Sequence, residues 1–350
     1  WPEALGNQPV QLGLAGAINA LNVQISEPTT LKLLAKAQTD LTHPALPFSA
    51  DVALDTAPLN TFVKLPAEAN FRPGVMTLSA NGDMHSQNAR VNFAFSGFGF
   101  GQTQPANLAL NAVHSPGHVQ QLQLQFEDST SQSALELNGS LAYGELLQWQ
   151  LQSQIQKLVL NSPVIPVQGD IHGQLDHQGS WSEQKWHVRL DDTQLSGSLN
   201  NLPLRLSAVA DINQDELLRV SNIDLRLQAF NSTVKITGQA DQQWQLQGTA
   251  FSDDLSALLN EGSGKAEANF RVSGALADPL IELNGLVKQL NLQQMDWQDL
   301  SIAARYQPMQ QHSGELTLSF PHLVVDNSQH FHGRLSLSGN APQHQLQLVV

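Results

Sequence analysis

Strict alternation of apolar and polar side chains is the dominant pattern of this 350-residue chain. Examples are Leu-Gln-Leu-Gln-Phe at 122–126, Ile-Asp-Leu-Arg-Leu at 223–227 and Leu-Thr-Leu-Ser-Phe at 316–320. Successive side chains of a strand point to opposite faces of a sheet, so each run predicts a strand with one buried face. Roughly twenty or more such runs, separated by short turns rich in Gly, Asn, Asp, Pro and Ser, extend from end to end.

Helical periodicity is rare in the same sequence. The segment 30–37 predicts one or two helical turns, and the segments 57–62 and 254–259 predict single turns, the last with Asp254 as its N-cap. None of these segments is long enough to cover a large sheet. The apolar sheet face is therefore expected to meet another sheet or to close on itself.

The number of strands predicts an elongated molecule. At ~12–14 residues for a strand and its turn, the chain supplies ~25–29 strands, far above the ~10 of ordinary open sheets. A recurring apolar-x-Gly-x-apolar pattern, as at 171–175 and 236–240, places Gly on the apolar side, where it lets a strand bend and leaves open space. We predict an all-β fold, in which an elongated, twisted, mainly antiparallel sheet curls into a taco-like trough with an apolar interior. A few single-turn helices accompany one continuous module over residues 1–350.

Charge and composition exclude several functions. Lys and Arg number 17 against 31 Asp and Glu, which gives a net charge of −14. Binding nucleic acid requires clustered Lys and Arg, so no nucleic-acid partner is expected. With Cys at 0 the chain has neither disulfides nor thiolate sites. No apolar run approaches the ~18 residues of a membrane span, and the start at Trp1 and strand-like end predict a piece of a longer chain.

No residue pattern points to catalysis. The sequence Gly-Ser-Gly-Lys at 262–265 lacks the first Gly of a phosphate-binding loop and is better explained by a turn. His330 and His332 share one side of a strand but lack a third ligand, and the pairs Asp191-Asp192 and Asp253-Asp254 are typical of turns. We therefore expect no enzyme activity, no metal and no cofactor.

The apolar face is the feature that remains, and two interpretations of it stay open. Its side chains either interdigitate in a dry core, or line an open trough that lipid acyl chains fill. In the second case the predicted lining consists of Leu135, Leu137, Leu204, Leu206, Leu225, Leu227, Val234, Ile236, Leu246, Phe270, Val272, Leu283, Leu316, Leu318, Leu335 and Leu337.

Several motifs between residues 160 and 340 follow one another in a distinctive order. They are a Trp-containing strand pair at 236–248, Asp-Leu-Ser-Ala-Leu-Leu at 254–259, a pair of strands around Ser-Gly-Ala-Leu-Ala-Asp-Pro at 273–279, Leu-Asn-Gly at 283–285, and Trp-Gln-Asp-Leu-Ser-Ile at 297–302. This order resembles the TamB family, within the broader AsmA-like group of bridge-type lipid-transfer proteins. The resemblance implies an internal segment of a periplasmic β-taco that joins the inner and outer membranes of a Gram-negative envelope.

The same resemblance implies function and partners. Members of the family are anchored in the inner membrane, pair with the outer-membrane barrel protein TamA, and are implicated in phospholipid transport and outer-membrane protein assembly. The leading hypothesis is that phospholipid acyl chains move along a hydrophobic groove. One alternative is a scaffold that assembles outer-membrane proteins by strand pairing. The other is a structural or adhesive β-fibre with a closed core.

Overall fold

The computed structural model describes residues 10–61, 69–100, 106–128, 131–161, 168–215, 217–259, 261–293, 295–309, 312–326, 328–340 and 343–349. The chain divides into two compact units, which we call unit 1 (Trp1–Val159) and unit 2 (Leu160–Val350). Each unit is described by itself.

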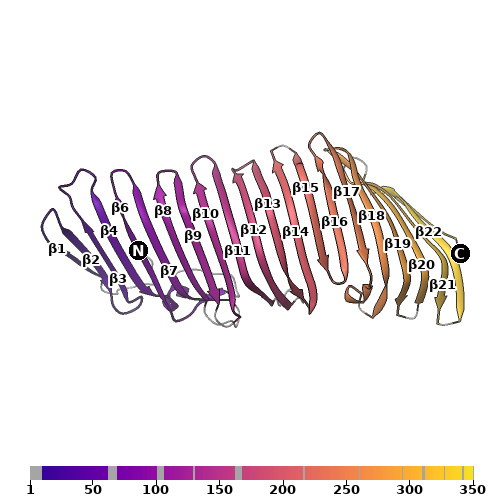
Figure 1. Cartoon of the computed structure of the whole chain (residues 1–350), viewed down its shortest axis with the longest axis horizontal. Coiled ribbons are helices and arrows are strands. Elements are labelled where there is room, and N and C mark those ends of the chain that lie inside the picture. Colours follow the sequence, from indigo (N-terminus) through magenta and orange to yellow (C-terminus); the bar gives the residue numbers. More distant parts are fainter. Residues whose placement is uncertain are drawn as a thin grey trace. The chain divides into compact units, whose positions relative to one another are not determined.

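Unit 1 is an antiparallel sheet in which strands pair with their neighbours in the chain (Figure 1). One excursion interrupts this order: β4 pairs directly with β6, and the short β5 pairs with the far end of β7. The strands are β1 (Gln11–Ala15), β2 (Leu21–Glu27), β3 (Leu33–Thr39), β4 (Pro47–Asp55), β5 (Ala69–Phe71), β6 (Val75–Asp83), β7 (Asn88–Phe100), β8 (Ala106–Ser115), β9 (His118–Asp128), β10 (Ser133–Ala142) and β11 (Leu147–Asn161), of which β11 crosses the boundary to unit 2.

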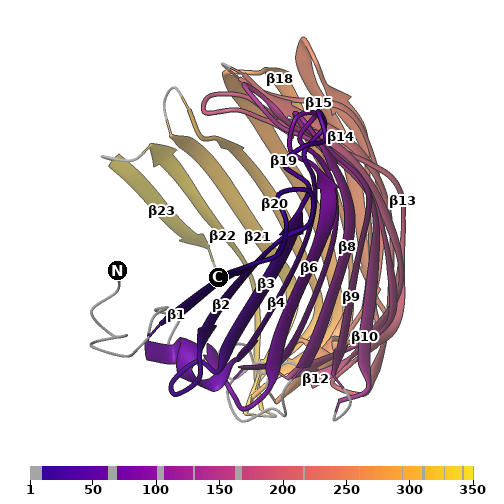
Figure 2. The same ribbon diagram turned by 90° about the vertical axis from the view of Figure 1, so that its left-hand side faces the viewer.

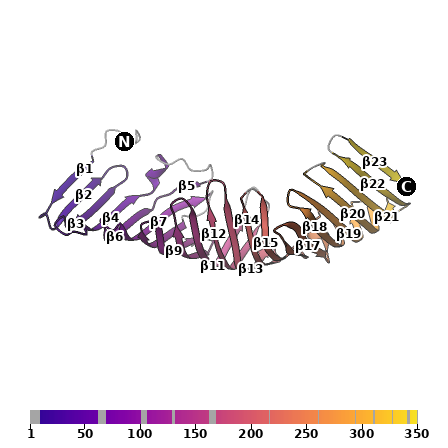
Figure 3. The same ribbon diagram turned by 90° about the horizontal axis from the view of Figure 1, so that it is seen from above.

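Unit 2 is an uninterrupted antiparallel meander, and its strands follow one another in chain order (Figure 3). Many of them are long, and β19 has 15 residues. The strands are β12 (Gln168–Trp181), β13 (Trp186–Leu199), β14 (Leu202–Gln214), β15 (Leu218–Ala229), β16 (Ser232–Ala240), β17 (Gln243–Ser252), β18 (Gly262–Ala275), β19 (Asp278–Leu292), β20 (Met295–Gln307), β21 (Ser313–Val325), β22 (Gln329–Asn340) and β23 (Gln343–Val349).

The predicted all-β, antiparallel class is confirmed, and the described residues contain no α-helix. They form 23 strands, fewer than the roughly 25–29 expected, because the strands of unit 2 are longer than the average strand. In each unit the sheet is open and neither closed nor strongly curled, in contrast to the predicted taco-like trough. The sheet is not closed because strands pair with close neighbours in the chain, and no register joins the first described strand of a unit to its last.

The short helices agree with the sequence at two positions out of three. A 3-10 helix, η2, spans Ala57–Thr61 and lies at an edge of the unit 1 sheet (Figure 2). A second, η3, spans Leu255–Ala257, and the Asp254 carboxylate accepts a hydrogen bond from the Ser256 amide, as expected of an N-cap. The predicted helix at 30–37 is wrong: Leu33–Thr39 is strand β3, whose exposure alternates with period two.

Three local predictions need correction. Residues 262–265 begin strand β18 and do not form a turn. Asp191 and Asp192 lie inside β13, where the register with β14 shifts between Leu190 and Thr193, so a bulge replaces the predicted turn. The open space expected beside inward glycines is filled at Gly248, because a Cβ there would lie 2.1 Å from the ring of Phe270 on the neighbouring strand.

Other inward glycines have a backbone reason. Gly173 in β12 has φ +141°, and a Cβ at this position would lie 1.9 Å from the carbonyl oxygen of Gln194. Gly139 in β10 has φ +155° and would meet the Gln150 carbonyl oxygen at 2.0 Å. Both positions bring neighbouring backbones closer than any side chain allows, so both require Gly.

Candidate functional site: the apolar face

Two rows of cross-strand neighbours cross unit 2 from β12 to β23. The first, which we call the Leu225 row, runs Leu175, Thr193, Ala208, Leu225, Ile236, Gly248, Phe270, Leu283, Ala304, Leu316, Leu337, Leu346. The second, the Leu227 row, runs Gly173, Leu195, Leu206, Leu227, Val234, Ala250, Ala268, Gly285, Ile302, Leu318, Leu335, Leu348. Apart from Thr193, every position is apolar or Gly, and none carries a charge.

Unit 1 contains rows of the same kind. The Leu137 row runs from β1 to β10 through Leu12, Ile25, Ala35, Val52, Leu78, Phe93, Leu110, Leu124 and Leu137. The Leu135 row runs from β4 to β11 through Leu54, Met76, Phe95, Leu108, Phe126, Leu135 and Ile155. Each unit therefore has one sheet face made of contiguous apolar positions.

The structure brings the predicted lining residues together on these faces. Leu135 and Leu137 lie in unit 1, and the others lie in unit 2 within or next to its two rows. Leu246 and Val272 form a cross-strand pair beside the Leu225 row, and Leu204 pairs with Gly197 beside the Leu227 row. All are half-buried except Leu204, which is 7% exposed, and Leu337, which is 40% exposed.

Sequence reasoning missed the small residues that complete the rows. Ala208, Ala250 and Ala268 stand at inward positions of the two rows, where Ala250 and Ala268 are cross-strand partners of each other. The signal was available, because each shares the parity of the apolar residues on its own strand. The register between paired strands decides which side chains form one row, and the sequence of a single strand does not give this register.

The opposite face of unit 2 is polar and charged. Arg271, Glu282, Arg305 and Glu315 are successive cross-strand neighbours from β18 to β21, so opposite charges alternate along this row. On the same face Glu267 and Lys288 form an ion pair with 3.4 Å between Oε1 and Nζ. Such pairs are weak at exposed positions, but they mark this face as the one in contact with water.

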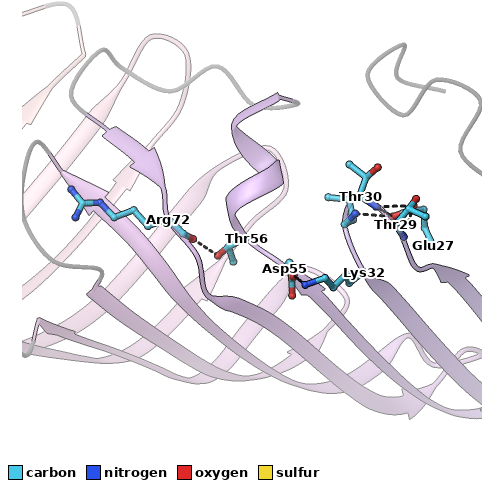
Figure 4. A network of polar contacts seen from close by, with 8 residues as sticks. Glu27, Thr29, Thr30, Lys32, Asp55, Thr56 and Arg72 are labelled. Atoms are coloured by element: carbon cyan, nitrogen blue, oxygen red, sulfur yellow. Dashed lines mark hydrogen bonds and ion pairs between the residues drawn. The ribbon is translucent and has the colours of Figure 1, made fainter.

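A polar network closes the connection between β2 and β3 in unit 1 (Figure 4). The Glu27 side chain is 1% exposed and accepts hydrogen bonds from the backbone amides of Thr29, Thr30 and Leu31, with N–O distances of 2.7 to 3.0 Å. The hydroxyl of Thr29 also donates to Oε1. Together, led by this hydroxyl, these donors lower the pKa of Glu27 to about 2, although burial alone would raise it. Glu27 thus stabilises a loop.

The described residues offer no metal centre, because no group of three or more His, Asp or Glu side chains comes together in them. His330 instead stacks at a tilt against His322, with ring centroids 5.4 Å apart. Across the same part of the chain, no helix has the length and apolar character that crossing a bilayer would need.

Comparison with known proteins shows which family this chain resembles. A family model described as the N-terminal domain of TamB matches residues 2–350, beyond the region 160–340 where the sequence motifs lie. The "Translocation and assembly module subunit TamB" of Haemophilus influenzae is 23% identical over 355 residues, which cover 98% of this chain and 26% of that protein. The chain thus spans about a quarter of that relative's length, and no solved structure matches it. With almost its whole length matched by the family model, the chain belongs to the TamB N-terminal domain family.

Proposed function

We propose that the apolar faces of this chain line a groove that carries phospholipid acyl chains. The chain would act as a non-enzymatic part of a longer periplasmic protein that is anchored in the inner membrane, bridges to the outer membrane of a Gram-negative cell and pairs there with TamA. The observation that carries the proposal is the apolar, uncharged character of the Leu225 and Leu227 rows from β12 to β23, in which Thr193 is the one polar side chain. The groove lining in this proposal is the set of residues predicted from the sequence.

The magnitudes favour a continuous lining over a single pocket. Each methylene removed from water contributes ~0.8 kcal/mol, so a lipid with ~30 methylenes requires ~24 kcal/mol of shelter. A pocket that supplied this shelter at one place would hold the lipid there. Rows made mostly of Leu, Ile, Val, Phe and Ala residues supply it along the whole sheet, and the barrier between steps stays small.

The apolar side chains of the rows are only half-buried, and this favours a face that acyl chains occupy over a closed core. Leu225 and Ile236 lie on central strands with neighbours on both sides, yet neither is buried. Side chains meshed in a dry sandwich core would be almost fully buried. This counts against the closed β-fibre. We propose further that the sheet bends around its apolar face, as a taco-like trough, when acyl chains occupy it.

A photo-crosslinking pair tests the proposal on one strand. A photoreactive residue at Leu225 faces the apolar row, and the same residue at Arg226 lies between Ser207 and Lys235 on the polar face. In cells, we expect phospholipid adducts at position 225 and few or none at 226. Equal lipid capture at both positions would remove the groove.

The edge strands favour a second candidate function. Every residue of β1 and of β23 is exposed, and each strand has one pairing partner among the described strands. In this second candidate function the chain is a scaffold for outer-membrane assembly, and a sheet edge pairs with the strands of a client barrel protein. That function would tolerate Leu225→Arg, whereas lipid transport would not.

A further inference from the structure

The ends of the strands form two long edges of the unit 1 sheet, one on each side, and these two edges differ in chemistry. Because consecutive strands run in opposite directions, alternate connections lie on the same edge. We call one of them the apolar edge, and it is formed by the connections 16–20, 40–46, 84–87, 116–117 and 143–146.

Large apolar side chains stand exposed along this edge. Ile18 is 66% exposed, Leu41 47%, Met84 49%, Tyr143 44% and Leu146 38%. At the opposite edge Val75, the first residue of β6, is 48% exposed, but the described connections there carry no large apolar residue of comparable exposure, and one of them is closed by the Glu27 network (Figure 4). Scattered surface Leu and Met residues need no explanation, but their collection on one edge does.

Hydrogen bonds join the connections of the apolar edge into a fixed series. The Leu41 amide donates to the Ile18 carbonyl at 3.0 Å, and the Met84 amide donates to the Leu46 carbonyl at 3.2 Å. The Tyr143 amide donates to the Gly117 carbonyl at 2.8 Å.

His114 completes the series. Its Nδ1 lies 2.9 Å from the Gln87 carbonyl oxygen, and its Nε2 contacts the Tyr143 hydroxyl. The apolar side chains are therefore presented on an ordered backbone, so little conformational entropy is lost when the edge binds a partner.

Spacing and charge indicate the kind of partner. Neighbouring connections are two strands apart, or ~10 Å, so the apolar side chains are separate anchors with polar residues between them. Fluid lipid can surround separate anchors, whereas a protein partner would need a matching pocket for each. The five connections contain no Lys or Arg but do contain Asp40 and Glu145, which disfavours an anionic surface. Tyr143 is of the type that settles at the boundary between lipid and water.

We propose that the apolar edge of unit 1 inserts into the interfacial layer of a phospholipid bilayer with neutral head groups. The contact would bring the apolar face within reach of the bilayer from which the proposed function draws its lipid. It does not depend on that function, since an edge can bind a membrane whether or not the face carries acyl chains.

Vesicle flotation tests the contact. The 350-residue chain is mixed with phosphatidylcholine vesicles, and the floating fraction is compared with that of a variant carrying Ile18→Ser, Leu41→Ser, Met84→Ser and Leu146→Ser. We expect the variant to lose at least tenfold in partitioning. The matched control carries Val75→Ser, Phe251→Ser and Leu258→Ser, residues that are 48%, 47% and 54% exposed away from this edge, and it should float like the wild type.

A single-site probe keeps the test valid if the multiple variant fails to fold. The chain has no cysteine, so Met84→Cys gives one position for an environment-sensitive fluorophore. Val75→Cys, at the opposite edge of unit 1 and equally exposed, is the control. On adding vesicles, the emission should shift to the blue at position 84 and stay unchanged at position 75.

Several outcomes would overturn the proposal. They are no flotation of the wild type with neutral vesicles, flotation that requires phosphatidylglycerol, equal loss in the control variant, and a homodimer that dissociates in the edge variant in place of vesicle binding. Crosslinking at Leu225 with lipid supplied in detergent micelles separates this proposal from the function above. If the chain floats with vesicles but no lipid is crosslinked at Leu225, the groove proposal fails and the membrane contact stands. If lipid is crosslinked at Leu225 but the chain does not float, the membrane contact fails and the groove proposal stands.

Discussion

Unit 1 and unit 2 share one alternating pattern but differ in regularity. In unit 2 both apolar rows pass through every strand from β12 to β23. In unit 1 the Leu137 row passes from β4 directly to β6, and the described residues between these two strands form an excursion that carries η2 and β5, with β5 paired to the far end of β7. The alternating pattern is therefore sufficient to build the rows. The excursion of unit 1 lies between β4 and β6 in the chain, but it does not interrupt the Leu137 row.

The excursion is held by contacts that unit 2 does not need. Thr56 is fully buried, and its hydroxyl donates to the Arg72 carbonyl at 2.7 Å. The Asn60 side chain accepts from the Phe71 amide and donates to the Phe71 carbonyl, as a neighbouring strand would. The ring of Phe71 packs edge-on against Phe95, with centroids 5.6 Å apart. Polar side chains and aromatic packing here replace the missing strand partner.

The largest expected effect on function tests whether the two units serve one lipid path. Leu225→Arg in unit 2 and Leu110→Arg in unit 1 each place a charge in an apolar row. A charge in a hydrocarbon-like layer costs ~2.5–3.5 kcal/mol, which corresponds to roughly 100-fold. We expect either substitution in the parent protein to reduce phospholipid transfer between vesicles by that order while the sheet stays folded. Thr249→Arg on the polar face is the control. If only one of the two Leu variants reduces phospholipid transfer, the two units do not serve one lipid path.

The second effect compares the aromatic packing of the two units. Phe95 in unit 1 and Phe320 in unit 2 are both 8% exposed, and Phe320 packs edge-on against Trp297 with centroids 5.3 Å apart. Removing a buried Phe side chain costs about 3–5 kcal/mol. We expect Phe95→Ala and Phe320→Ala to lose similar free energies of unfolding in urea titrations. A loss confined to Phe95→Ala would show that only the excursion depends on aromatic packing.

A smaller effect comes from the inward glycines of both units. Gly139→Ala and Gly173→Ala force a side chain onto a neighbouring backbone, at a cost of about 1–3 kcal/mol. Gly285→Ala is the matched control in the Leu227 row, since its Cβ would come no closer than 3.5 Å to any atom. Thermal unfolding should show a clear loss for the first two and none for the third. Equal behaviour of all three would contradict the close backbone approach.

The smallest effect concerns Glu27, whose loop has no counterpart described in unit 2. Its pKa is lowered from 4.5 to about 2, so the ionised side chain stabilises the fold at pH values above 4.5. This contribution should fade as the pH falls from 4.5 towards 2. Glu27→Gln should lower the unfolding temperature of unit 1 at pH 7, and the difference from the wild type should narrow at pH 3. A difference independent of pH would assign the effect to packing.

Much of this fold could be predicted from residues near one another in the chain. The alternation at 223–227 fixes which side chains of β15 share a face, and Asp254 before an apolar turn predicts η3. The helix predicted at 30–37 is wrong because Leu and Ala residues also favour a helix. Pairing with β2 and β4 stabilises this segment as a strand. The excursion and the apolar edge depend on which connections meet across the sheet, which local sequence does not encode.

The nearest-neighbour pairing of unit 2 has a consequence for how such proteins fold and evolve. Each strand of the meander is stabilised by the strands before and after it, so folding can begin at any hairpin and spread in both directions. Loss or duplication of a whole hairpin would preserve the direction and parity of all later strands, whereas loss of a single strand would invert them. The length of such a chain can therefore change in steps of two strands while the chemistry of each face is inherited intact.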